Sequence, residues 1–203
     1  MKILVTGFTP FGGESVNPAW LAVQALPEKI GEHVIDKAEI PTAFAASRQV
    51  ITERINALRP DAVICVGQAG GRDAVTIERV AINVMDASIP DNDGDQPMDE
   101  PVVPGAPAAY FATLPIKKMM EAIRASGLPA RISNTAGTYV CNTLMYHVLH
   151  HAAEKAPSML GGFIHVPYVT EQVQGKPAGT PAMPLEDIVR ALTLAIEVVE
   201  KGA

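Results

Sequence analysis

One cysteine stands where the chain could make it a nucleophile. Cys141 follows a turn of small residues and precedes apolar residues at helical spacing, so the pattern predicts it in the first turn of a helix. With Thr138 as the N-cap, Cys141 would take the third helical position, where free backbone N–H groups and the helix dipole favour a negative charge. A thiolate carries such a charge, so the sequence predicts a lowered pKa for this thiol.

A histidine further along the chain could activate this cysteine. His165 lies in the short apolar run 163–166, between a Gly-Gly pair and a proline, and this pattern is typical of a buried strand. We expect that strand to bring His165 beside the start of the Cys141 helix, as a base next to a nucleophile. Alone, each residue would more often be a packing residue, as we expect for Cys65 in the middle of another predicted strand.

An acidic residue within a predicted strand leaves two alternatives open. Glu78 lies between Ile77 and Arg79, and a carboxylate buried there needs a partner. Arg79 or Arg72 could provide a structural ion pair. Alternatively, Glu78 could orient His165 as the third member of a catalytic triad. Spacing alone does not decide between the two.

Metal binding is not favoured by the sequence. His147 and His151 have the spacing of two ligands on one helical face, but no further ligand pattern accompanies them, so we expect a solvated face. Two cysteines are too few for a disulfide framework. We therefore predict no metal and no other cofactor.

The composition indicates one globular domain that spans residues 1–203. The chain has 48% hydrophobic and 19% charged residues, which argues against disorder. Its net charge is −6 and it has no basic run, so neither nucleic acid nor a membrane surface is an expected partner. No apolar run approaches the roughly 20 residues that span a bilayer, and the N-terminus lacks the features of a signal peptide. We expect a cytoplasmic protein.

Predicted strands and helices alternate along the chain. The strands are expected at 2–7, 33–40, 62–66, 130–133 and 163–166, with a strand or hairpin at 75–86. The helices are expected at 18–26 with Asn17 as the cap, at 41–58, at 115–126, around 141–152 and at 184–200. This order favours a three-layer α/β/α sandwich with a mostly parallel, mixed central sheet. Ligands of such sheets bind at the carboxyl ends of the strands, where the loops at Phe8–Phe11 and Gln68 should meet His165.

The sequence does not decide the roles of three loops. Phe8 and Phe11 lie in a loop rich in glycine and proline, where they either join the core, which is the default, or line an apolar pocket. The loop 67–71 is glycine-rich, but it matches no phosphate-binding motif. The acidic excursion Ile89–Ala109 is expected over the surface, as a subunit contact or a lid.

Seven short motifs together resemble the pyroglutamyl peptidase I family, also called pyrrolidone-carboxylate peptidases. They run from Thr6 to Tyr168 in the family's order and cover most of the chain. They are T-G-F-x-P-F-G-G with N-P, V-G-Q-A-G-G-R, E-R-V-A-I-N, I-P-D-N, G-A-P-A-A-Y, T-A-G-T-Y-V-C-N and G-G-F-I-H-V-P-Y.

The resemblance implies a cysteine peptidase that removes an N-terminal pyroglutamyl residue from peptides through a thioester. It places the nucleophile at Cys141, the base at His165 and the third catalytic residue at Glu78. It also implies a substrate pocket with the backbone of Gln68 facing the lactam, lined by Phe8, Phe11, Tyr139 and Val140. The fold implied is related in outline to nucleoside phosphorylases, and the assembly implied is a homotetramer.

Two residues depart from the family pattern. Ser88 stands where many members have arginine, so a positive charge near the site is either absent or supplied by another residue, with Arg72 as the candidate. Tyr139 stands where several members have phenylalanine, and its hydroxyl must find a partner or face outward.

Two interpretations compete with the peptidase. A nucleoside phosphorylase or hydrolase would need convergent arginines, which the sequence does not show. In a binding module without catalysis, Cys141 and His165 would only pack. Alkylation of the two thiols would separate the last alternative from an enzyme with a reactive cysteine.

Overall fold

A seven-stranded sheet forms the centre of the computed structural model, which describes residues 1–200. From edge to edge the strands are β2 (Lys29–Ile30), β3 (His33–Ile40), β1 (Lys2–Phe8), β4 (Ala62–Gln68), β9 (Leu160–Val166), β5 (Val75–Glu78) and β8 (Ala130–Ser133). Neighbouring strands from β3 to β9 run parallel, and β8 is parallel to β5. Only β2 against β3 and β5 against β9 are antiparallel. The sheet is therefore mixed and mostly parallel, as predicted.

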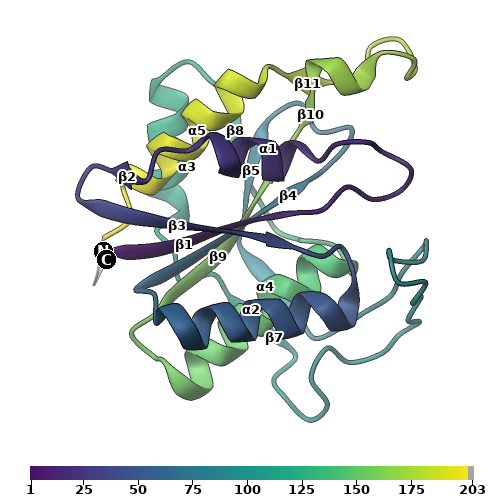
Figure 1. The fold of residues 1–203 in the computed structure, drawn as a ribbon, viewed down its shortest axis with the longest axis vertical. Coiled ribbons are helices and arrows are strands. Elements are labelled where there is room, and N and C mark those ends of the chain that lie inside the picture. Colours follow the sequence, from purple (N-terminus) through teal and green to yellow (C-terminus); the bar gives the residue numbers. More distant parts are fainter. Residues whose placement is uncertain (201–203) are drawn as a thin grey trace.

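Helices cover both faces of this sheet. Helices α1 (Pro18–Ala25), α3 (Ile116–Ala125) and α5 (Leu185–Glu197) lie on one face, and α2 (Phe44–Leu58) and α4 (Val140–Lys155) lie on the other (Figure 1). Every residue of β4 is buried, which requires cover on both sides. The three-layer α/β/α sandwich predicted from the sequence is confirmed.

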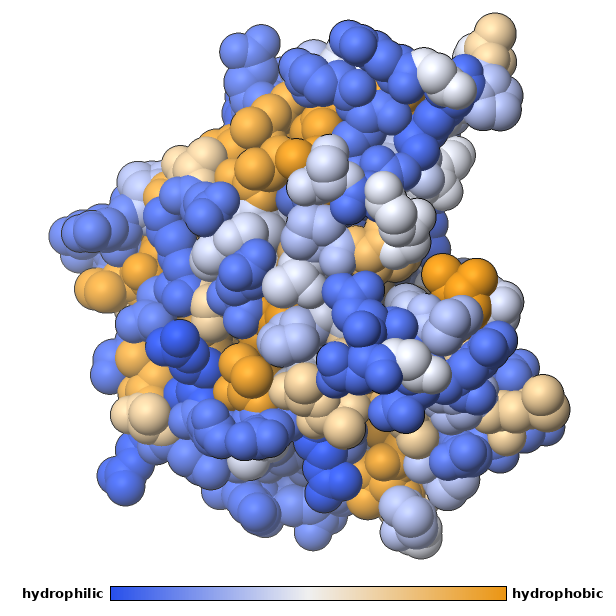
Figure 2. Space-filling view, turned by 45° about the vertical axis from the view of Figure 1, so that its right-hand side comes forward, coloured by the Kyte–Doolittle hydropathy of each residue, from blue (hydrophilic) through white to orange (hydrophobic). Residues whose placement is uncertain are grey.

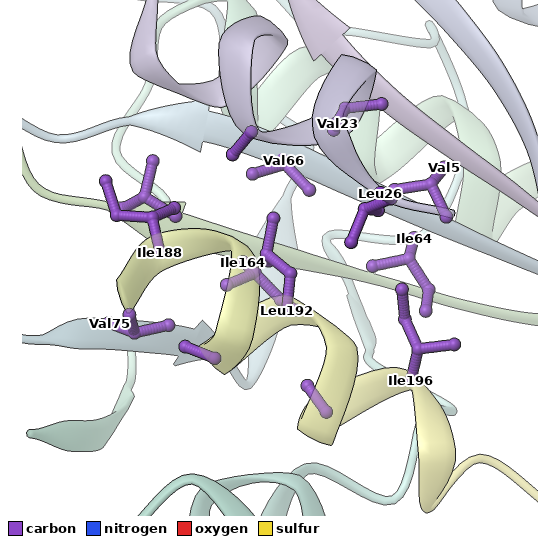
Figure 3. Packing of buried hydrophobic residues seen from close by; sticks show 14 of the residues in the cluster. Val5, Val23, Leu26, Ile64, Val66, Val75, Ile164, Ile188, Leu192 and Ile196 are labelled. Carbon is purple, nitrogen blue, oxygen red and sulfur yellow. The ribbon is translucent and has the colours of Figure 1, made fainter. Parts of the chain in front are cut away.

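Each face of the sheet has its own apolar core. On the α5 side, Ile188, Leu192 and Ile196 point at the sheet (Figure 3). They meet strand residues that include Val5, Ile64, Val66, Val75 and Ile164. Full burial of such a side chain contributes about 1.5–3 kcal/mol, so this layer of side chains holds α5 against the sheet. The core on the α2 and α4 side contains Phe8, Cys65, Leu144, Tyr146 and Phe163.

Two glycines that indicated a turn lie inside a strand. Gly161 and Gly162 belong to β9, which begins at Leu160 rather than after them. A Cβ at Gly162 would come 2.6 Å from Leu114, and one at Gly161 would come 3.0 Å from Val148. The missing side chains let neighbouring segments approach the strand closely, which is why glycine is used here.

The segment 75–86, predicted as a strand or a hairpin, forms two strands that belong to different sheets. It divides into β5 and β6 (Val80–Ile82), and β6 leaves the main sheet to pair with β7 (Ala109–Phe111). The excursion 89–109 connects these two short strands. At the other end of the chain, β10 (Tyr168–Val169) and β11 (Ala182–Met183) form a small parallel pair around the 3-10 helix η1 (Thr170–Val173).

Helix starts depend on contacts from distant segments. Asn17 caps α1 as predicted, because its Oδ1 accepts the N–H of Ala19 at 3.0 Å. Helix α2 begins at Phe44, later than predicted, and the Asp91 carboxylate accepts the Phe44 N–H at 2.7 Å. Helix α5 ends at Glu197, earlier than predicted. Within residues 1–200, no helix combines the length and apolarity needed to cross a membrane.

Candidate active site

The carboxyl ends of the parallel strands meet at one edge of the sheet. This edge lies on the right in Figure 1, next to the loop after β1. The outline in Figure 2 is indented on the right, between an upper and a lower part of the molecule. Gln68 ends β4 and is paired with Val166, while Gly67 is paired with His165. The structure thus brings the Gln68 loop and His165 together at this edge, as expected.

Cys141 is the second residue of α4, not the third. The residue before the helix is Tyr139, and it makes no side-chain capping bond. The Thr138 hydroxyl, which we expected to cap the helix, donates instead to the Asp86 carbonyl at 2.7 Å. The first N–H to reach a helical acceptor is that of Thr143, so the N–H groups at the start of α4 remain available to a ligand.

Gly67 is the point where this helix start meets the sheet. A Cβ at Gly67 would come 3.0 Å from the Cys141 Sγ and 2.7 Å from the Phe163 ring. Because Gly67 is paired with His165 on the neighbouring strand, the thiol lies against the strand next to the histidine. Only glycine leaves room for the sulfur at this place.

The predicted lowering of the Cys141 pKa is wrong for the free protein. Burial raises the pKa of this thiol to about 12, and the charges of Glu78 and Cys65 act in the same direction. Arg72 and the backbone N–H of Cys141 lower the pKa, but they do not outweigh desolvation. Cys141 is therefore a neutral thiol at neutral pH, and it needs a base to become a nucleophile.

Glu78 binds a histidine and an arginine through the same oxygen. Its Oε1 accepts from Nδ1 of His165 at 2.7 Å and from Nη1 of Arg72 at 2.7 Å. Glu78 therefore makes both contacts that the sequence left open, one to Arg72 and one to His165, while Arg79 donates to Asn134 instead. A carboxylate only accepts, so Nδ1 carries the ring proton and Nε2 of a neutral His165 is the unprotonated nitrogen.

Burial and neighbouring polar groups together set the charge of both partners. Burial lowers the pKa of His165 below its usual range, Glu78 raises it, and Arg72 lowers it further. Burial would raise the pKa of Glu78, but His165, Ser133 and Arg72 bring it below its usual value. At neutral pH, Glu78 is therefore ionised and His165 is neutral.

One oxygen of Glu78 is left without a hydrogen bond. Within residues 1–200, its Oε2 is buried and has no hydrogen-bond partner. Ser133 lies near enough to lower the carboxyl pKa, but its hydroxyl donates to the Thr135 carbonyl at 3.0 Å. All the hydrogen bonding of this carboxylate is thus concentrated on the oxygen that faces His165 and Arg72.

The two phenylalanines of the first loop have different environments. Phe8 is buried in the core, and its ring centre lies 6.2 Å from that of Phe163. Phe11 is half-buried and faces Tyr139, at 6.1 Å between ring centres. Phe44 contacts the other side of Tyr139 edge-on at 5.4 Å. The core alternative therefore holds for Phe8, and the pocket alternative stays a prediction for Phe11.

Tyr139 has a partner for its hydroxyl. It donates to the Pro90 carbonyl at 3.1 Å, and so ties the helix start to the excursion 89–109. Ser88, just before this excursion, is exposed. The positive charge nearest the catalytic candidates comes from Arg72, as the sequence suggested. Val140 is fully buried in the core.

Two anchoring residues escaped the sequence analysis. Asn142 is fully buried, accepts the Ile82 N–H at 2.9 Å and donates to the carbonyls of Ile82 and Val84 at 2.9 and 3.0 Å. Asn92 donates through its side chain to the Pro10 carbonyl at 2.9 Å. Asn142 could have been found from the sequence, because it is a polar residue within the apolar face of a predicted helix.

The histidines of α4 are not all solvated. His147 is partly buried beside a cavity of about 410 Å³ that also touches Phe44 and Arg48, and burial lowers its pKa to about 4. The solvated face expected for this residue is therefore wrong. Among the described residues, no group of three or more histidine, cysteine or acidic side chains is arranged to hold a metal.

Known proteins resemble this chain along its whole length. A sequence profile of the pyroglutamyl peptidase family matches residues 1–202. The pyrrolidone-carboxylate peptidase of Alkaliphilus oremlandii is 55% identical over 196 residues, covering 97% of this chain and 92% of that protein. The pyrrolidone-carboxylate peptidase of Thermococcus onnurineus is 52% identical over 197 residues, covering 97% and 98%.

Solved structures agree with these sequences. The crystal structure of Bacillus amyloliquefaciens pyroglutamyl peptidase I matches with a TM-score of 0.93 at 46% identity, covering 98% of this chain and 96% of that one. A mutant pyrrolidone carboxyl peptidase from Pyrococcus furiosus matches with a TM-score of 0.94 at 48% identity, covering 98% of both chains. This chain therefore belongs to the pyroglutamyl peptidase family of cysteine peptidases.

Proposed function

We propose that this enzyme hydrolyses the amide bond after an N-terminal pyroglutamyl residue of peptides, with Cys141, His165 and Glu78 as its catalytic triad. The observation that carries the proposal is the 2.7 Å bond from His165 Nδ1 to Glu78. It leaves Nε2 as the basic nitrogen on the strand that adjoins the Cys141 thiol. The family membership supplies the substrate class.

Acylation begins with a proton transfer. Because the pKa of Cys141 is raised to about 12, the thiol gives its proton to His165 Nε2 as the sulfur attacks the pyroglutamyl carbonyl. The ionised Glu78 stabilises the imidazolium that forms. The N–H groups at the start of α4 would stabilise the developing oxyanion.

The tetrahedral intermediate then collapses to a thioester. The C–N bond breaks, and His165 returns its proton to the departing amine, which leaves as the shortened peptide. A water molecule gives a proton to His165 and attacks the thioester. The C–S bond breaks, pyroglutamate leaves, and the thiol regains its proton from His165.

Selectivity follows from the character of the proposed pocket. A lactam has an apolar ring with one N–H and one C=O, which suits the rings of Phe11 and Tyr139 and the backbone of Gln68. An amino acid with a charged ammonium group would have to lose its hydration in the same apolar surroundings. We therefore expect pyroglutamyl substrates to be preferred over prolyl substrates of similar ring size.

Release of a fluorophore from a pyroglutamyl amide tests the proposal. The wild type should turn it over and should leave the prolyl amide intact. Cys141→Ala should lose at least about 10⁴-fold in kcat, because the acyl-enzyme cannot form. Cys65→Ala is the matched control: Cys65 is fully buried in the core, so this variant should keep the activity.

Two results would contradict the proposal. A folded wild type that releases no fluorophore from the pyroglutamyl amide would favour a binding module. Full activity in Cys141→Ala would assign the nucleophile elsewhere.

A further inference from the structure

A buried glutamine connects three segments at the edge of the sheet. Gln172 lies in η1 and is 9% exposed. Its Oε1 accepts the Val169 N–H at 3.1 Å. Its Nε2 lies 3.0 Å from Gln68 Oε1, 3.3 Å from Glu14 Oε2 and 3.3 Å from the Val16 carbonyl. Gln172 takes no part in the proposed chemical steps.

The orientation of this network follows from its fixed members. A backbone N–H can only donate, so Val169 requires the oxygen of the Gln172 amide on its side. The Val16 carbonyl and the Glu14 carboxylate can only accept, so they require the amide nitrogen on theirs. Gln68 must then present its oxygen to Gln172, and its side chain is held in one orientation.

The Gln68 side chain lies on the face of the sheet opposite the thiol. A Cβ at Gly67 would point at Cys141 and Phe163, and successive side chains of a strand point to opposite faces. Gln68 therefore points to the other face, where Gln172 meets it. Its backbone remains at the end of β4, one residue from the position paired with His165.

We propose that Gln172 is a positioning residue, which anchors Gln68 from the face opposite Cys141 and so fixes the backbone that binds the pyroglutamyl lactam. This inference rests on the proposed function, because the lactam contact is part of it. The anchor makes substrate binding depend on a side chain that never touches the substrate.

Steady-state kinetics of Gln172→Leu on a pyroglutamyl amide tests the inference. The variant should raise KM about five- to tenfold, which is the effect expected for loss of the single hydrogen bond to Gln68, and should keep kcat within about threefold. Gln174→Leu is the matched control, because Gln174 is exposed two residues further along the same segment. It should leave KM and kcat unchanged.

A double-mutant cycle shows whether Gln172 acts through Gln68. Gln68→Leu removes the side-chain amide that Gln172 binds but retains the backbone groups proposed to bind the lactam. It should therefore raise KM to a similar extent as Gln172→Leu. The double variant Gln68→Leu/Gln172→Leu should then have about the KM of either single variant, because the same contact is lost. Fully additive effects on KM would overturn the inference.

A second result would also overturn it. If Gln172→Leu lowers the melting temperature but leaves KM unchanged, the residue only supports the fold. Failure of the proposed function is distinct from both results, because it would appear as absent turnover in the wild type.

Discussion

At the residue scale, Arg72 and Glu78 have opposite effects on the proposed base. Glu78 accepts from His165 and raises its pKa, while Arg72 binds the same carboxylate oxygen and lowers the pKa of His165. Glu78 and Arg72 therefore both influence the pKa of His165. With Glu78 alone, the pKa would be higher and the imidazolium would hold its proton more tightly. Burial, which has the largest effect on the pKa of His165, and Arg72 together keep it in the neutral form that can accept the Cys141 proton.

Removing the arginine should shift the pH dependence of catalysis. Neutral His165 is the active form, so kcat/KM should fall as pH decreases through its pKa, which lies below 6.5. Arg72→Met removes an influence that lowers this pKa, so the acid limb should move to higher pH. A pH profile of kcat/KM measures the shift, and movement to lower pH would contradict this account.

The Tyr139 hydroxyl should contribute to stability more than to chemistry. Tyr139→Phe loses one hydrogen bond to the Pro90 carbonyl, so unfolding should become easier by about 1 kcal/mol, with kcat within about twofold. Tyr146→Phe is a matched variant on the same helix, since its hydroxyl donates to the Pro107 carbonyl at 2.6 Å. Urea denaturation with kinetics of both variants checks this, and a loss of kcat in Tyr139→Phe above about tenfold would be inconsistent with it.

Residue identities were easier to predict than residue properties. The positions of Cys141 and His165 followed from motif and periodicity, and both residues lie at the predicted edge of the sheet. The pKa of Cys141 did not follow, because desolvation depends on what packs around the thiol. The cap at Thr138 also failed, because its hydroxyl is used by Asp86, far away in the sequence.

At the scale of elements, Asn142 attaches the start of α4 to β6. Its amide makes three bonds to the backbone of Ile82 and Val84, as a neighbouring strand would. The residue beside the proposed nucleophile is thereby fixed relative to the segment that follows Glu78. The helix start is thus held by side-chain bonds to backbone rather than by a conventional cap.

Breaking this attachment should destabilise the protein strongly. Asn142→Leu leaves one N–H and two carbonyl groups unpaired in a buried place, which should cost on the order of 4 kcal/mol. Asn56→Leu, at an exposed position of α2, should change stability by less than about 0.5 kcal/mol. Urea denaturation measures both, and equal stabilities for the two variants would refute the role given to Asn142.

Element boundaries were predictable where local pattern and packing agree. The strands 33–40 and 130–133 have the predicted bounds, because turn residues flank them on both sides. At Gly161 and Gly162 the local pattern indicated a turn, but close packing of Leu114 and Val148 needs glycine within the strand. Such a contact joins segments distant in sequence, so local patterns do not contain it.

At the scale of the whole molecule, the layers follow from the order of the elements, but the site follows from long-range contacts. The excursion 89–109 illustrates this, since composition placed it on the surface and only the structure joins it to Tyr139 and to α2. The homotetramer and the cytoplasmic location implied earlier stay predictions. Light scattering would test the first against the 21.5 kDa mass of one chain.

Because one oxygen of Glu78 binds both Arg72 and His165, the association of enzyme and substrate should depend little on salt. Glu78 and Arg72 cancel in charge, and His165 and Cys141 are neutral, so the centre is electroneutral although the protein carries −6. A pyroglutamyl residue has no charged amino terminus, so an uncharged pyroglutamyl amide brings no charge that salt could screen to this neutral centre. For an uncharged pyroglutamyl amide, kcat/KM should therefore change less than about twofold between about 0.05 and 0.5 M sodium chloride.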